Sequence, residues 1–206
     1  MRVKSEARRE NIARAAMEVF LENGFEAASM SDIARRAGGS KATLYSYFDS
    51  KQELFAEVMD TLCSGRFKAV YDHLEFDGDV ARTLTRFGTA LLLTLMEPDL
   101  MAIRRTVIAA SKHDGVGRLF YERGPKLGWS RIQAFLEDQT ARGTLACPDS
   151  WQATVHLLSL LEGDWGMRAM LGVIDKAEPA DVERYVASAV GVFLRAYGTE
   201  RSRVKK

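Results

Sequence analysis

Residues 29–55 read SMSDIARRAGGSKATLYSYFDSKQELF, and this stretch decides the fold of the chain. Ser29, Ser40 and Ser50 each stand just before a run with helical spacing, and serine is a favoured N-cap residue. An acidic residue stands three positions after Ser29 and after Ser50, which is the capping-box form. Gly38-Gly39 separates the first two runs, as is typical of a helix stop. The stretch therefore predicts two short helices joined by a glycine turn, followed by a long helix.

A longer helix is predicted upstream, over residues 5–23. Its apolar face repeats at three- and four-residue spacing through Ile12, Ala15, Ala16, Val19 and Phe20. Asn23-Gly24 supplies the stop, because glycine readily adopts the left-handed conformation, and Phe25 is expected to fold back onto the helix. One longer helix followed by two short ones is the helix-turn-helix arrangement, which places its second short helix in the major groove of DNA.

The matching positions of this segment extend almost without a break from residue 12 to residue 55. They run Ile12-x-x-Ala15-Ala16-x-x-x-Phe20-x-x-x-Gly24-Phe25, then Ser29-Met30-x-Asp32-Ile33-Ala34-x-x-Ala37-Gly38, then Ser40-Lys41-x-Thr43-Leu44-Tyr45-x-Tyr47-Phe48-x-x-Lys51-x-x-Leu54-Phe55. This pattern resembles the head of the TetR/AcrR family of transcriptional regulators. Gly39 departs from it, because the family usually has a small β-branched residue such as valine there.

The resemblance implies two sets of residues in the head. The packed set is Ile12, Ala16, Phe20, Phe25, Ile33, Ala34, Leu44, Phe48 and Leu54. The DNA-binding set is Ser29, Ser31, Lys41, Ala42, Thr43, Tyr45, Ser46, Tyr47 and Lys51. Hydroxyls of Thr43 and Tyr45 suit phosphate oxygens, whereas Lys41, Ser46 and Tyr47 suit base edges and Ala42 suits a thymine methyl group. Lys51 and the N-terminus of its helix are expected to hold one phosphate together, and Ser29 and Ser31 are further phosphate candidates. For any one of these residues the alternative is an ordinary surface side chain.

Four bases near the start, Arg2, Lys4, Arg8 and Arg9, are expected to form a flexible arm that contacts the DNA backbone or minor groove. A basic terminus that only improves solubility explains them equally well.

The rest of the chain also has helical spacing, and the fold class is all-α, with nine or ten helices. The breaks predict that the long helix after Ser50 ends near residue 73. Six more helices are then predicted, over residues 79–97, 99–112, 116–122, 125–142, 150–171 and 179–197. We expect two domains: a DNA-binding head over residues 1–52, with its helix-turn-helix motif at about 29–48, and a helical effector-binding and dimerisation domain over 53–206.

The last two long helices are expected to pair with those of a second copy. In the second half, Arg104-Arg105 with Val107-Ile108 and Arg142-Gly143-x-Leu145 followed by Asp149 resemble AcrR-type regulators, in which these helices form a four-helix bundle between subunits. Both helices are apolar over a wide arc, which predicts one side in the chain's own core and another against a partner. The expected homodimer interface is Val155, Leu158, Trp165, Val186, Val190 and Phe193.

A small-molecule effector is expected to bind between the helices of the second domain. The candidate pocket residues are Phe67, Tyr71, Phe87, Leu91, Arg104, Phe120, Tyr121, Trp129 and Trp165. Aromatic and aliphatic walls with few charges suit a hydrophobic or amphipathic ligand. The alternative is that these residues are ordinary core of a helical bundle.

Several kinds of chemistry are not expected. Cys63 and Cys147 have no CxxC partner, and the three histidines are widely separated, so we expect no metal and no cofactor. No apolar run approaches the roughly 20 residues of a membrane span, and no signal peptide is recognised, which favours the cytoplasm. The sequence has no pattern of paired acids, of a nucleophile with a base or of a phosphate-binding glycine loop, so no catalytic residue is expected.

The sequence thus predicts a homodimeric repressor that binds double-stranded DNA at a palindromic operator and is released by an effector. An activator, or a regulator that answers a protein partner, would use the same head. A helical enzyme and a scaffold that does not bind DNA are the remote alternatives.

Overall fold

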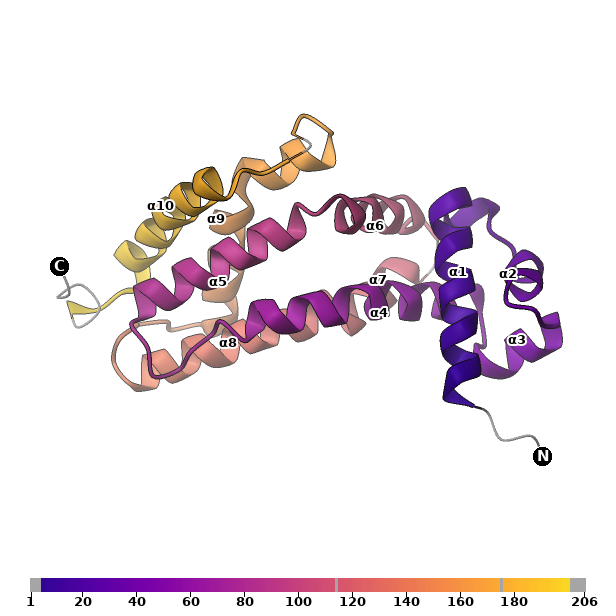
Figure 1. The fold of residues 1–206 in the computed structure, drawn as a ribbon. Coiled ribbons are helices and arrows are strands. Elements are labelled where there is room, and N and C mark those ends of the chain that lie inside the picture. The colour runs from indigo at the N-terminus through magenta and orange to yellow at the C-terminus, as the bar shows by residue number, and fades with distance from the viewer. Residues whose placement is uncertain (1–4, 114, 175, 201–206) are drawn as a thin grey trace. The chain divides into compact units, whose positions relative to one another are not determined.

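Ten helices make up the described part of the chain, which is residues 5–113, 115–174 and 176–200 of this computed structural model, with the backbone alone at residues 60 and 62–64 (Figure 1). They are α1 (Glu6–Ala27), α2 (Met30–Arg36), α3 (Lys41–Tyr47), α4 (Lys51–Tyr71), α5 (Val80–Leu95), α6 (Pro98–Ala110), α7 (Val116–Arg123), α8 (Pro125–Ala141), α9 (Ser150–Met170) and α10 (Pro179–Tyr197). Within those ranges the extended pairing is a single isolated bridge between Leu145 and Gly198. The predicted all-α class is confirmed.

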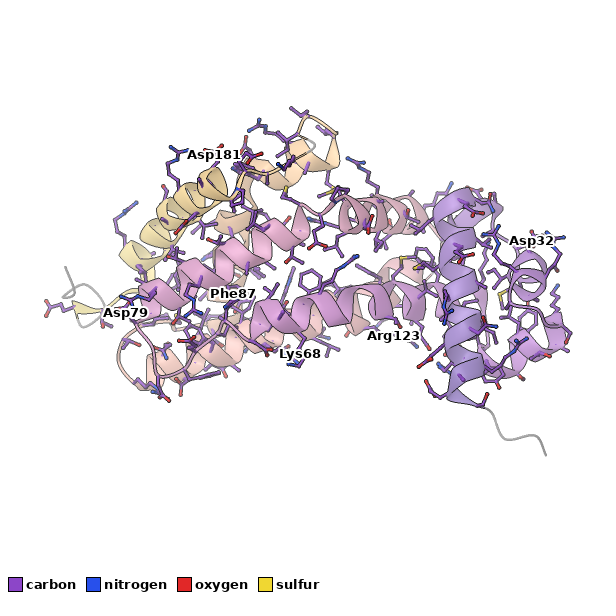
Figure 2. The ribbon with its side chains drawn as sticks, in the orientation of Figure 1. Asp32, Lys68, Asp79, Phe87, Arg123 and Asp181 are labelled. Atoms are coloured by element: carbon purple, nitrogen blue, oxygen red, sulfur yellow. The ribbon has the colours of Figure 1, made fainter. Side chains whose placement is uncertain are left out.

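The helix starts follow from local hydrogen bonds. Ser29, Ser40, Asp79 and Asp149 each accept a hydrogen bond from the backbone N–H three residues on, which satisfies one of the free donors at a helix start. Asp79 lies directly before α5 (Figure 2). Gly24 has φ 72° and ψ 171°, so the regular part of α1 ends at the predicted residue and one more turn follows the kink.

The chain divides by its contacts into two compact units, Met1–Ser64 with Ala102–Lys126, and Gly65–Met101 with Leu127–Lys206. The expected head, residues 1–52, lies in the first unit, which also includes α7 and most of α6. The expected boundary at residue 52 stays a proposal about function.

The core of the first unit is built around three phenylalanine rings from two helices, α1 and α4. Phe20 and Phe55 meet edge to face with centroids 5.0 Å apart, and Phe25 meets Phe55 at 5.1 Å. Phe25 also stacks on Phe20 at 6.0 Å, so it does fold back onto α1 as expected. Ile33 of α2 and Leu44 of α3 are fully buried. Figure 1 shows α2 beside α1 and α3 beside α2, and these buried side chains hold them there.

The core of the second unit lies where α10 runs along α5 and α9 (Figure 1). Phe87, labelled in Figure 2, is completely buried on α5. The next residue on α5, Gly88, gives space to the neighbouring helices, because a Cβ atom there would lie 2.6 Å from Leu161 of α9 and 2.8 Å from Val186 of α10. The absence of a side chain therefore allows the three helices to approach closely.

Most residues of the expected dimer interface are packed within the chain itself. Val186, Val190 and Phe193 of α10 are buried in the chain's own core, and Leu158 of α9 is buried as well. Val155 and Trp165 are half-buried. The sequence could not show this, because a wide apolar arc on a helix does not indicate which of its sides meets the chain's own helices. A partner subunit would have to cover the opposite, exposed side of α10.

Candidate nucleic-acid interface

The recognition-helix candidate α3 exposes almost all of its side chains. Leu44 is 1% exposed and fixes the helix from below, whereas Tyr45 is 44% exposed, which is unusual for so large an aromatic side chain. Lys41, Ala42 and Ser46 are also exposed, and Thr43 and Tyr47 are half-buried. A helix of seven residues is about 10 Å long and fits into a major groove. The expected packed and outward sets are separated on this helix.

The hydroxyl groups on and before α3 have local partners. Ser40 Oγ accepts a hydrogen bond from the Thr43 N–H at 3.1 Å and lies 2.9 Å from Thr43 Oγ1. Ser46 Oγ donates to the Thr43 carbonyl at 2.7 Å. Next to them the Lys41 ammonium lies 5.9 Å from the centre of the Tyr45 ring. Because these groups are at the surface, a phosphate or base edge can replace the local contacts at small cost.

Two of the residues expected to contact DNA also form hydrogen bonds within the head. Ser29 Oγ caps α2 and donates to Asp32 Oδ2 at 2.6 Å, so its hydroxyl is already occupied (Figure 2 labels Asp32). Tyr47 at the end of α3 accepts, through its phenol oxygen, a hydrogen bond from the Ser5 N–H at 3.2 Å. Ser31 is exposed. A DNA-binding role for Ser29, Ser31 and Tyr47 stays a prediction.

Lys51 points into the chain. Its ammonium donates to the carbonyl oxygens of Phe25 at 2.7 Å, Ala28 at 2.9 Å and Glu26 at 3.3 Å, and lies 4.4 Å from the centre of the Phe25 ring. Burial lowers the pKa of Lys51, and the nearby carboxylate of Glu26 opposes this by a smaller amount. A cation is favourable there because the carbonyl end of a helix carries partial negative charge. The ammonium protons therefore hold the end of α1 in place. The predicted phosphate would have to compete with these carbonyl oxygens for the same protons.

Two of the four basic residues expected in a flexible arm lie in a helix instead. Arg8 and Arg9 lie within α1, while Arg2 and Lys4 lie outside the described residues. Arg9 forms an ion pair with Glu57 of α4, and this hydrogen bond raises the pKa of the guanidinium, which also lies 4.6 Å from the centre of the Phe48 ring. Arg8 reaches the turn between α2 and α3. Helical spacing places both side chains on α1, but it does not show which element they meet.

Arg35, at the last turn of α2, is a basic residue that the pattern did not single out. It is 81% exposed, and its guanidinium pairs with Asp32 Oδ1 at 2.5 Å. Exposed pairs of this kind contribute little to stability, so Arg35 is available for another anion. By contrast, Arg36 pairs with Glu22 of α1 at 2.8 Å, which raises the pKa of Arg36.

The expected effector residues are only partly brought together. In the second unit, the rings of Phe67 and Tyr71 lie 6.3 Å apart and those of Tyr71 and Phe87 5.9 Å apart, with Leu91 buried one turn beyond Phe87. Burial raises the pKa of Tyr71 to about 12.

Trp129 and Trp165 pack against the same hydrophobic core as these residues, and each also meets another aromatic ring. Trp129 meets Trp151 at 6.0 Å, and Trp165 meets Tyr185 at 6.1 Å. Arg104, Phe120 and Tyr121 belong to the first unit. A surface hollow of about 350 Å³ in the first unit is lined by Asn23, Gly24, Phe25, Glu26, Arg105, Thr106, Ala109, Ala110, Lys112 and His113, and includes none of the nine expected pocket residues.

Within the described residues, three or more histidine, cysteine or acidic side chains do not gather in any place that would hold a metal ion. Cys147 is buried as a free thiol, whereas the side chain of Cys63 lies outside the described part. Across the same ranges, no helix has both the length and the apolar character needed to cross a membrane.

Comparison with known proteins gives two family matches. Residues 12–58 match the model of bacterial regulatory proteins of the tetR family, and residues 82–199 match the C-terminal domain of AefR-like transcriptional repressors. The second match alone covers more than half of the chain.

Individual relatives agree with these matches. A regulator from Mesorhizobium loti assigned to the TetR family is 28% identical, with a TM-score of 0.82 over 96% of this chain and all of the other. The flavonoid-responsive regulator FrrA is 33% identical, with a TM-score of 0.79 over 94% of this chain and 98% of the other. The transcriptional activator FasR from Mycolicibacterium smegmatis is 46% identical over 68 residues, which are 31% of each protein. The matched segment therefore spans less than a third of the length of FasR.

Proposed function

The chain belongs to the TetR family of DNA-binding transcriptional regulators, which are not enzymes, and we propose that it acts as a homodimeric repressor released from a palindromic operator by a small effector. The observation that carries the DNA-binding part is α3: a short helix that buries Leu44 and presents Lys41, Tyr45 and Ser46 outward from a rigid core.

We assign separate tasks to the outward residues. Thr43 and Tyr45 bind phosphate oxygens. These contacts position the head on the DNA and do not depend on the base sequence. Lys41 and Ser46 reach base edges in the major groove, and Ala42 contacts a thymine methyl group. Arg35, exposed at the end of α2, adds a phosphate contact.

The proposed dimer uses the exposed side of α10 rather than its buried one. Ala187, Ser188 and Val192 are exposed on that side, and their small side chains permit close approach of a second helix. On α9, Met167 is an exposed apolar neighbour in the same unit. Two copies related by a two-fold axis present their heads to half-sites about 34–36 Å apart, or a multiple of that distance.

The proposed effector is small and hydrophobic or amphipathic. The aromatic row of Phe67, Tyr71 and Phe87 supports this, since such side chains line most small-molecule sites. FrrA is described as flavonoid-responsive, which favours an aromatic ligand. To release DNA efficiently, the effector must bind the released conformation several kcal/mol more tightly than the DNA-bound one.

Activation is the second candidate, because FasR is named an activator and resembles this chain closely over its matched segment. Selection of duplexes from a random pool by the purified chain tests DNA binding, and the expected result is a palindrome with two equal half-sites. A reporter gene placed behind the selected duplex then gives the sign of regulation. Expression that rises when the regulator is deleted supports repression, and expression that falls supports activation.

A further inference from the structure

The turn between α2 and α3 is held from outside by α1. Arg8 Nη1 donates to the carbonyl of Ala37 at 2.9 Å, and Arg8 Nη2 donates to the carbonyl of Gly38 at 3.1 Å. Asn11, one helical turn along α1, donates to the same Ala37 carbonyl at 3.0 Å. The two carbonyls that follow the last turn of α2 therefore accept three hydrogen bonds from α1. The Ala37 carbonyl accepts two of them, one from a charged donor and one from a neutral donor.

Gly38 and Gly39 have different reasons to be glycine. Gly38 has φ +65°, and its N–H donates to the Arg35 carbonyl while the Gly39 N–H donates to the Ala34 carbonyl, which is the Schellman ending of a helix. A side chain at Gly38 is therefore strained by the backbone itself.

Gly39 has no such backbone requirement, because its φ lies outside the left-handed region. A Cβ atom at Gly39 would instead lie 2.2 Å from Arg8 Nη2. The absence of a side chain at Gly39 leaves the space that the Arg8 guanidinium group occupies.

We propose that Arg8 is a positioning residue for DNA recognition and that Gly39 leaves the space that the Arg8 guanidinium occupies. Arg8 fixes the direction in which the chain leaves α2, and Ser40, the N-cap of α3, follows Gly39 directly. The angle of the recognition helix thus depends on an arginine of α1 that does not touch DNA itself. This inference rests on the proposed DNA-binding function.

A double-mutant cycle tests the pair. The variants are Arg8→Ala, Gly39→Ala and the two combined, with Gly24→Ala alone and combined with Arg8→Ala as the control, because Gly24 also has a positive φ and makes no contact with Arg8. Affinity is measured by fluorescence anisotropy on one duplex selected by the wild-type chain, at several salt concentrations. Urea unfolding followed by circular dichroism gives the same cycle without DNA.

Each of Arg8→Ala and Gly39→Ala is expected to weaken affinity about tenfold, and the combined variant is expected to be no weaker than either, because both remove the same contact. Gly24→Ala is expected to change the affinity by the same factor with and without Arg8. Arg8→Lys restores only part of the affinity, since an ammonium does not present two parallel donors. The slope of log affinity against log salt stays unchanged in Arg8→Ala.

Two results would overturn the proposal. Losses that multiply to about a hundredfold in the combined variant would show that Arg8 and Gly39 act separately. A salt slope that falls by about one in Arg8→Ala would show that Arg8 binds a phosphate. If the wild-type chain selects no duplex, the proposed function fails, and the urea cycle then decides on the pair: the unfolding constants must show the same lack of additivity.

Discussion

Replacing Lys51 by methionine removes the ammonium and keeps an unbranched stem, so the change isolates the hydrogen bonds that this group makes. The ammonium donates to three carbonyls at 2.7, 2.9 and 3.3 Å and lies 4.4 Å from the Phe25 ring. A hydrogen bond to a charged group contributes about 1.5–3 kcal/mol, and a half-buried group that shares its protons among several acceptors is expected near the lower end. We therefore expect Lys51→Met to reduce the free energy of unfolding by about 2 kcal/mol.

The assay must report on the head. All three tryptophans, Trp129, Trp151 and Trp165, lie in α8 and α9, so their fluorescence follows the second unit. Far-UV circular dichroism follows all helices and is the appropriate signal for urea unfolding. Lys68→Met is the matched control: it removes an exposed ammonium on the same helix, α4, that pairs with Asp72 at 2.8 Å, and a loss below about 1 kcal/mol is expected.

The salt dependence of DNA binding separates the two uses of Lys51. If the ammonium holds the end of α1, the slope of log affinity against log salt is the same in Lys51→Met and in wild type. A slope reduced by about 0.9, together with unchanged stability, would refute the reasoning and restore the predicted phosphate contact.

Three further predictions concern the second unit. Burial of Tyr71 raises its pKa from 10.0 to about 12. The unfolded chain therefore loses this proton first as the pH rises, and between pH 10 and 12 the wild type should lose about 1.4 kcal/mol of stability per pH unit beyond what Tyr71→Phe loses. Equal pH profiles would contradict this. Gly88→Ala places a methyl group 2.6 Å from Leu161 and should reduce the free energy of unfolding by about 1–3 kcal/mol, as urea titration would reveal. Val192→Glu introduces a charge on the exposed side of α10 and should weaken the dimer at least about tenfold in sedimentation equilibrium. Ile108→Glu serves as its control, because Ile108 of α6 is an exposed apolar residue outside the proposed interface, and a dimer equally tight in both variants would exclude that interface.

The helix boundaries were predictable because they depend on interactions between neighbouring residues. Ser29, Ser40 and Asp149 cap their helices through bonds to the N–H three positions on, a spacing that is fixed in the sequence. Pro98 and Pro125 begin helices for an equally local reason. The separation of buried Leu44 from its outward neighbours follows in the same way from helical spacing.

Contacts between distant segments were not predictable to the same degree. Arg8 was expected in a flexible arm, yet it lies in α1 and donates to a carbonyl 29 residues away. Lys51 was expected at a phosphate, yet its protons meet carbonyls more than 20 residues away. Phe193 was expected at a dimer interface and lies in the chain's own core. For Lys51 and Phe193 the helix was correctly predicted, but in all three cases the partner depends on how the helices pack.

The most direct test of the account is the affinity of a variant that combines Lys41→Ala with Tyr45→Ala, measured by anisotropy on a duplex selected by the wild-type chain. Leu21→Ala is the control, because Leu21 and Tyr45 are both 44% exposed and both lie in the head. We predict that the combined variant binds about a hundredfold more weakly while its circular dichroism spectrum stays the same, and that the control binds like wild type. Equal affinity of the combined variant and the wild type would contradict the claim that α3 reads DNA.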